Sequence, residues 1–104
     1  MKKVVNFDTF LHIVRVCSNN TDDAIFLALM IECYWRYSGC RFPLSSETME
    51  AYTGLSSDKA RRCYKRLNEL GFVVKTVRRN QIGTPVNHYE VDIDTIQLAL
   101  NSRK

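Results

Sequence analysis

Basic side chains are concentrated in one stretch of the chain. Residues 55–80 contain eight Lys or Arg side chains against two acidic ones, a net charge of +6, although the whole 104-residue chain carries only +4. Positive charge gathered on one part of a small domain is the electrostatic footprint of a protein that binds phosphate groups of a nucleic-acid backbone. A solvated helix face is the other explanation of such a charge run.

The cysteines form no recognisable metal or redox motif. Cys17, Cys33, Cys40 and Cys63 are separated by 16, 7 and 23 positions, so none belongs to a Cys-x-x-Cys pair. Three of them, all but Cys40, stand among apolar neighbours at helical spacing, where a free cysteine packs as a small hydrophobic residue. We therefore expect reduced core thiols rather than disulfides or a metal site, and we expect no cofactor.

The sequence offers little for catalysis. Its four glycines are too dispersed to form a phosphate-binding loop. A Cys–His or Ser–His–Asp set would have to use His12 or His88, and neither has an obvious nucleophile nearby in the sequence. We interpret His12 as a core or rim residue and His88 as the partner in a structural hydrogen bond. We therefore expect a protein that is not an enzyme.

Apolar residues at three- and four-residue intervals predict two N-terminal helices, over residues 7–17 and 21–38, with Gly39 following the second. The second helix contains an eight-residue apolar run, Ala24–Ile31. We expect it to be the buried centre of the fold, or in part an oligomer surface. The predicted capping residues are Asn6 or Asp8 for the first helix and Thr21 for the second.

Capping serines and glycines delimit two further helices. The third opens at Ser45 and is ended by Gly54. The fourth is capped by Ser56 or Ser57 and runs to Leu70, with its apolar residues on one face. The opposite face centres on Asp58, Arg62, Lys65 and Glu69 and is flanked by Lys59, Arg61 and Arg66.

Extended segments follow a different pattern. Residues 41–44 are short and contain a proline, which predicts only a brief edge strand. Residues 72–79 are rich in β-branched side chains, and residues 86–93 alternate apolar and polar types, so the two segments predict a hairpin. A last short helix over 95–101 is predicted, with Asp94 as its cap.

Residues 44–93, about half of the chain, resemble a winged helix-turn-helix domain. The turn is Thr53-Gly54-Leu55-Ser56-Ser57, with Leu55 as a buried turn residue, and residues 59–72 correspond to the recognition helix. The family's Leu-x-x-Leu-Gly-aromatic-Val exit into the first wing strand is present at Leu67 to Val73. Asn87-His88-Tyr89 is similar to the return strand of winged-helix modules that begin phage and plasmid replication proteins.

The resemblance implies an α+β fold class, mainly α with a β-hairpin: a winged helix-turn-helix with a three-helix core plus flanking N- and C-terminal helices. The chain would be a single domain over 1–104, because its length is typical of one domain. Its parts would be the helix-turn-helix at 44–71, the wing hairpin at 72–93, and flanking helices at 1–39 and 94–101.

The resemblance also implies sequence-specific binding of double-stranded DNA, with the fourth helix in the major groove and the hairpin as a wing. Arg62 is our first choice for a bidentate contact to guanine, and Arg61 for its neighbour or a phosphate. The hairpin tip would contact phosphates or enter the minor groove. The predicted DNA-binding residues are Ser56, Ser57, Lys59, Arg61, Arg62, Lys65, Arg66, Arg78, Arg79, Asn80 and Gln81.

Two charged residues need separate interpretations. Asp58 would repel a phosphate, so we expect it to cap the helix or to accept a hydrogen bond from a cytosine amino group. Lys75 is earlier on the strand than the hairpin tip. We interpret it as a solvated charge that discourages pairing at a sheet edge.

Double-stranded DNA is thus the expected partner, and the protein would be a regulator or a replication-origin binder of a mobile element. The alternative is a winged-helix protein–protein interaction module, an adaptor or inhibitor, that uses the second helix and Tyr34, Trp35 and Tyr37; otherwise these aromatic residues pack. A homodimer through Ile96, Leu98 and Leu100 is also predicted.

The longest apolar run is far shorter than the roughly 20 residues of a membrane span, and Asn6 and Asp8 interrupt the apolar stretch after the basic start. We therefore expect no membrane contact, no signal peptide and a cytoplasmic location in the host cell.

Overall fold

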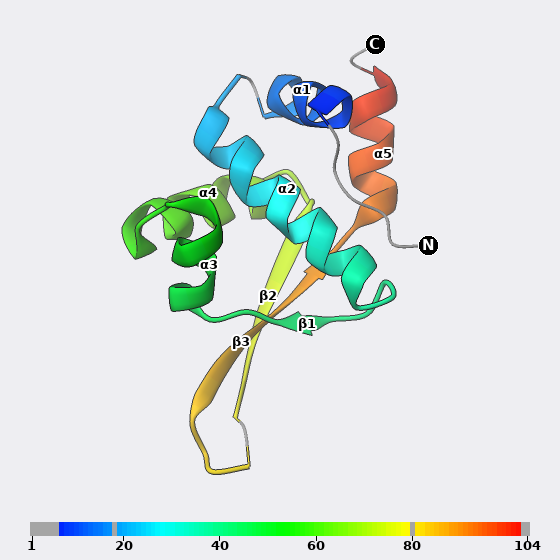
Figure 1. Ribbon diagram of the computed structural model, residues 1–104. Helices are drawn as coiled ribbons and strands as arrows, with labels where there is room; N and C mark the ends of the chain where they lie inside the picture. The colour runs from blue at the N-terminus through cyan, green and yellow to red at the C-terminus, as the bar shows by residue number, and fades with distance from the viewer. Residues whose placement is uncertain (1–6, 18, 80, 103–104) are drawn as a thin grey trace.

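The computed structural model describes residues 7–17, 19–79 and 81–102, and within them it has an α+β fold (Figure 1). Five helices accompany a small three-stranded antiparallel sheet, which confirms the predicted fold class at this level. The elements in chain order are α1 (Phe7–Val16), α2 (Thr21–Arg36), β1 (Phe42–Pro43), α3 (Ser46–Thr53), α4 (Ser57–Glu69), β2 (Val73–Arg79), β3 (Pro85–Val91) and α5 (Ile93–Ser102).

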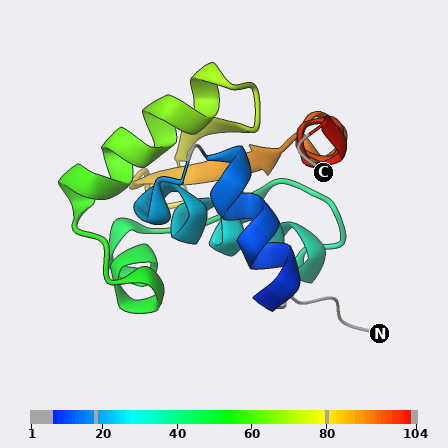
Figure 2. The same cartoon turned by 90° about the horizontal axis from the view of Figure 1, so that it is seen from above.

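The sheet has the strand order β1-β3-β2. Its hairpin pairs Val73 with Val91 at the base and Arg79 with Pro85 near the tip. The short β1 adds Phe42 opposite Tyr89 and is an edge strand, as its length and proline predict. Figure 1 shows the outer part of the β2–β3 hairpin extending beyond the helices, and in Figure 2 α3 and α4 lie on one side of the molecule and α5 on the other.

Helix α2 lies at the centre of the fold, as its apolar run predicts. It packs against α1, α3, α4 and β3. Phe26, Leu27 and Met30 are at most 1% exposed, because an apolar helix that contacts neighbours on several sides leaves little surface to water. The ring of Phe26 meets the ring of Tyr89 edge to face at 6.5 Å between centroids, which joins α2 to the sheet.

The helix ends agree with the predicted caps in α3 and α4. Ser45 Oγ accepts a hydrogen bond from the N–H of Thr48 at 3.1 Å, and Ser56 Oγ accepts one from the N–H of Lys59 at 3.3 Å. Gly54 ends α3 with a φ of +75°, a left-handed conformation that costs glycine little. These contacts fix the turn between the two helices, and Leu55 in that turn is buried.

Two other predicted caps are wrong. Asn20, rather than Thr21, caps α2, because Thr21 is already helical and Asn20 Oδ1 accepts from the N–H of Asp23 at 3.1 Å. Asp92, rather than Asp94, caps α5, because that helix begins at Ile93. Helix α2 also ends at Arg36, slightly before the predicted end. For the first helix, Asn6 lies outside the described residues, and the structure gives no account of the Asp8 side chain.

The cysteines Cys17, Cys33 and Cys63 are buried free thiols, and Cys40 is an exposed one. Burial in apolar surroundings raises the pKa of Cys17 and of Cys63 to about 12, and the charge of Asp23 adds to the shift in both. In the described part of the chain, no group of three or more His, Cys, Asp or Glu side chains could hold a metal ion. None of its helices is both long and apolar enough to cross a membrane.

Candidate nucleic-acid interface

Helix α4 separates apolar from basic side chains. Cys63 and Leu67 are fully buried on its inner face. The outer face carries exposed cations because, at about 100° per residue, these positions point away from the buried stripe. The exposed cations of α4 that make no ion pair with a described residue are Lys59, Arg62 and Lys65.

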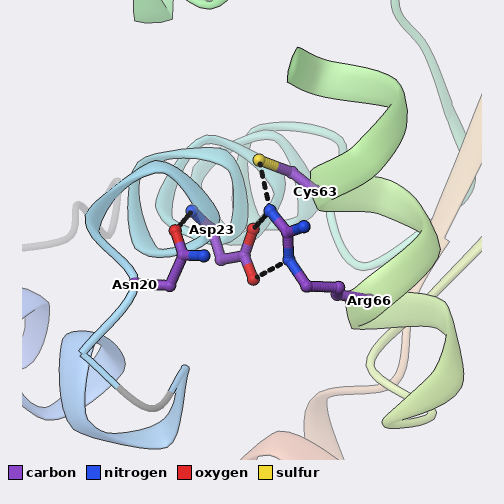
Figure 3. A network of polar contacts seen from close by, with 4 residues as sticks. All are labelled: Asn20, Asp23, Cys63 and Arg66. Atoms are coloured by element: carbon purple, nitrogen blue, oxygen red, sulfur yellow. Dashed lines mark hydrogen bonds and ion pairs between the residues drawn. The ribbon is translucent and has the colours of Figure 1, made fainter. Parts of the chain in front are cut away.

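Arg66 differs from its neighbours, because it is committed to a contact within the protein (Figure 3). Its Nε donates to Asp23 Oδ2 and its Nη2 donates to Asp23 Oδ1, both at 2.7 Å. The Asp23 side chain is 5% exposed and that of Arg66 is 46% exposed. Arg66 thus has a structural contact in addition to its predicted role in DNA binding, because two of its three guanidinium nitrogens, Nε and Nη2, already donate to a carboxylate.

The Arg66–Asp23 pair positions the helix that carries the other cations. Asp23 is in the first turn of α2, where the helix dipole favours a negative charge, and it holds α4 against α2. The hydrogen bonds to Asp23 are the main cause that raises the pKa of Arg66 above its usual range. Arg66 Nη2 also lies 3.9 Å from Cys63 Sγ, so the pair, the thiol and the cap at Asn20 form one network (Figure 3).

Asp58 does not cap α4, and its side chain pairs with Arg61 instead. Its Oδ1 is 3.3 Å from Nη1 of Arg61, and both side chains are more than 70% exposed. The predicted capping role is wrong because Ser56 occupies the capping position. An ion pair this exposed is weak, so Arg61 can exchange Asp58 for another anion at little cost.

Lys75 is not the solvated edge charge that its position predicts. Its Nζ lies 5.0 Å from the centroid of the Tyr64 ring, a cation–π contact, and its side chain is half-buried. Its backbone N–H donates to Tyr64 Oη at 3.0 Å, and Asn68 Nδ2 donates to the carbonyl oxygen of Val73 at 2.8 Å. These contacts tie α4 to the edge strand β2.

A hollow of about 190 Å³ lies where α3, α4 and the hairpin meet. Arg61 of α4 and Lys75 of β2 both line it, so the helix and the hairpin each contribute a cation to one surface. Its other lining residues are Ser46, Met49, Ser57, Ala60, Tyr64, Asn87 and Tyr89. Sequence reasoning missed Lys75, Ser46 and Asn87, because only the packing of the hairpin against α4 brings them beside Arg61.

The arginines of the hairpin tip lie on opposite faces of the hairpin. Successive residues of a strand alternate in direction, so Arg79 shares the face of Lys75, and Arg78 lies on the reverse face with Val74. Arg79 Nη1 donates to the carbonyl oxygen of Gly83 at 2.9 Å, which braces the tip. Gln81 is exposed, and Asn80 lies outside the described residues.

The cations of α4 likewise lie on different sides of the helix. Ser57, Arg61, Tyr64 and Asn68 form one stripe at helical spacing, and each of them lines the hollow or contacts β2. Lys59 precedes Arg66 by seven residues and so shares its side of the helix, which faces α2. The structure thus brings Arg61 toward the hairpin, leaves Arg62 and Lys65 outward, and puts Lys59 on the far side.

The other residues identified from the sequence have structural contacts. His88 Nδ1 lies 3.3 Å from the carbonyl oxygen of Val86, the structural hydrogen bond that its position predicts. Tyr34 meets Trp35 edge to face at 5.2 Å, and Tyr37 packs on Phe42 at 5.9 Å between ring centroids. These aromatic residues therefore pack within the fold, although Trp35 and Tyr37 are still about 40% exposed.

A comparison with protein-family models and a search of curated proteins found no match to this chain.

Proposed function

We propose that this chain is a winged-helix protein that binds double-stranded DNA with sequence preference. Helix α4 would be the recognition helix in the major groove, α3 would cross the backbone, and the β2–β3 hairpin would be the wing. The element order α3, turn, α4, β2, β3 supports the winged-helix assignment. A regulator or a replication-origin binder of a mobile element is the biological role in keeping with the resemblance of the sequence.

The observation that carries the proposal is the hollow shared by Arg61 of α4 and Lys75 of the hairpin. A recognition helix and a wing can grip one duplex only if their cations face the same side. Arg61 and Lys75 meet that condition, with Lys65 one helical turn further along α4 on the side of Arg61. Phosphate contacts from these residues would set the register of the helix in the groove.

Arg62 is the proposed base-reading residue. It is exposed, points outward from α4, and forms no ion pair with any residue of the described ranges. A guanidinium free of internal partners can present its fork to the O6 and N7 acceptors of guanine. Arg66, in contrast, is left out of the proposed interface because its Nε and Nη2 already donate to Asp23.

A second candidate function is protein–protein interaction, and one observation favours it. A hollow of about 400 Å³ between α2, β1 and α3 is lined by Tyr37 and by Tyr52, which is 66% exposed. Exposed aromatic side chains are enriched in the centres of protein interfaces. In this case the basic face of α4 would have no nucleic-acid partner.

Selection from a random duplex library tests the proposal. We expect an enriched motif that binds at least about 10³-fold more tightly than random duplexes, the lower end of the range for specific DNA-binding proteins. Failure to enrich any sequence, with no binding to the starting library, would favour the interaction-module function instead.

A further inference from the structure

The hollow between α3, α4 and the hairpin is lined by cationic side chains and by no acidic one. Two of its lining side chains, Arg61 and Lys75, are cationic, and none is acidic. The rest of its polar lining consists of hydroxyl and amide groups, from Ser46, Ser57 and Asn87 together with two tyrosines. Such a lining offers many hydrogen-bond donors to an anion and no repelling carboxylate.

Contacts with Tyr64 hold Lys75 at the hollow. The Tyr64 ring lies 5.0 Å below its ammonium group, and the Lys75 N–H is bound to the hydroxyl of the same tyrosine. Because the tyrosine hydroxyl accepts that bond, its own proton is available for another acceptor. The lysine is therefore held at the hollow with part of its side-chain entropy already lost, which lowers the cost of binding an anion there.

The size of the hollow suits a small anion. Its volume is about 190 Å³, and a water molecule takes up roughly 30 Å³ in the liquid, so a phosphate group with a few waters fits. The exposed Asp58 carboxylate that pairs with Arg61 does not line the hollow. Arg61 can turn from it toward an entering anion because an exposed ion pair contributes little.

We infer that this hollow is a binding site for one phosphate group, held by Lys75 and Arg61 with Ser57 and Asn87 beside them. The inference rests on the proposed function in that the phosphate would be a phosphodiester of the DNA backbone. Lys75 would then be an anchor between the recognition helix and the wing, and it would contribute affinity without reading sequence. Free phosphate offers the same chemistry, and the experiment below separates the two sources.

The test is the salt dependence of duplex binding, measured by fluorescence anisotropy with a 20-base-pair duplex. Lys75→Met keeps the apolar stem over Tyr64 and removes the charge. Loss of one phosphate contact should make the log–log slope less negative by about 0.9 and should weaken binding roughly eightfold at 0.1 M salt, for every duplex alike. Lys75→Arg should restore the slope, and Arg61→Gln should reproduce the loss if Lys75→Met proves unstable by circular dichroism.

Arg15→Met is the matched control, because Arg15 is an exposed cation of α1 that does not line the hollow. It should leave the slope as in the wild type. If the wild type binds duplex DNA and Lys75→Met and Arg61→Gln keep its slope, the phosphate site is wrong while the proposed function stands.

The second arm is titration with inorganic phosphate, monitored by amide resonances in NMR spectra. If the wild type fails to bind duplexes, the proposed function fails. Phosphate-induced shifts at Ser57, Lys75 and Asn87 that vanish in Lys75→Met would then still support the hollow as a site for free phosphate. Absence of those shifts together with absence of duplex binding would overturn the inference.

Discussion

Arg66 of α4 and Asp23 of α2, 43 positions apart in the sequence, form a two-point ion pair in which each hydrogen bond is 2.7 Å long. The Asp23 side chain is buried, whereas the Arg66 side chain is nearly half exposed. Removing one partner should therefore cost more than removing the other. Without Arg66, the buried Asp23 carboxylate cannot replace its hydrogen bonds with water, whereas without Asp23 the exposed part of Arg66 can.

The first prediction concerns stability. Arg66→Met should lower the free energy of unfolding by about 3 kcal/mol, because it leaves a buried carboxylate without its partner. Asp23→Asn should cost less, about 1–2 kcal/mol, because the exposed part of Arg66 can bind water instead. Urea unfolding measures both. Lys59→Met, an exposed change on the same side of α4, should stay within about 0.5 kcal/mol of the wild type; equal losses for all three variants would contradict the account.

The second prediction concerns pH. Cys17 and Cys63 have pKa values raised from 9.0 to about 12 in the folded state, so folding favours their protonated form. The unfolded chain loses these protons first. The contribution of the two protonated thiols to the free energy of unfolding should therefore be fully present below pH 9. It should decline as the pH rises from 9 toward 12. Thermal unfolding over this range measures the decline.

Thiol reactivity checks the same burial independently. At pH 8, iodoacetamide followed by mass spectrometry should modify the exposed Cys40 well before Cys17 or Cys63, which should react only after urea unfolds the chain. Equal labelling of all four thiols in the folded protein would refute the buried positions.

The third prediction distinguishes base reading from backbone contact. Arg62→Ala should weaken binding to the selected site by about 1–3 kcal/mol and relax the preference at one base pair. Arg79→Ala should instead weaken binding to all duplexes alike, both by removing a backbone contact and by releasing the Gly83 carbonyl at the hairpin tip. Anisotropy with the selected and a scrambled duplex measures each effect, and a uniform loss in Arg62→Ala would argue against base reading.

The fourth prediction concerns the start of α5. Asp92 Oδ1 accepts from the N–H of Thr95 at 3.0 Å, and this bond is the main reason that the pKa of Asp92 lies below its ordinary value. Asp92→Ala should therefore lower the melting temperature more than Asp94→Ala. The stabilisation by Asp92 should also be lost as the pH falls through its lowered pKa. Identical melting curves for the two variants would refute Asp92 as the cap.

Local features of the fold could be predicted from the sequence because local interactions determine them. Apolar spacing and capping serines located α3 and α4, and the alternation in residues 86–93 located the hairpin. Helix boundaries are less predictable: Thr21 is the predicted cap of α2, but the cap is the preceding Asn20, whose residue type has the stronger capping preference.

The parts of the site that the sequence could not predict depend on tertiary packing. In the sequence, Arg66 cannot be distinguished from the other basic residues of α4. Only the packing of α2 against α4 brings Asp23 within hydrogen-bond distance of it. From the sequence, Lys75 is likewise only a charged residue of a strand, and its contact with the Tyr64 ring depends on how the hairpin packs against α4. An acidic residue directly before an apolar run, as Asp23 is before Ala24–Ile31, is a sequence feature that hints at burial and therefore at a basic partner.

The most direct test of the central claim is duplex binding by the wild-type chain over a salt series. If the cations of α4 and the hairpin meet one duplex, log affinity should fall linearly with log salt, by about 0.9 per phosphate contact and several such contacts in total. Measurable affinity at low salt with that steep decline is the result predicted. Absence of duplex binding at low salt, or an affinity that does not change with salt, would contradict the claim that this basic face binds DNA.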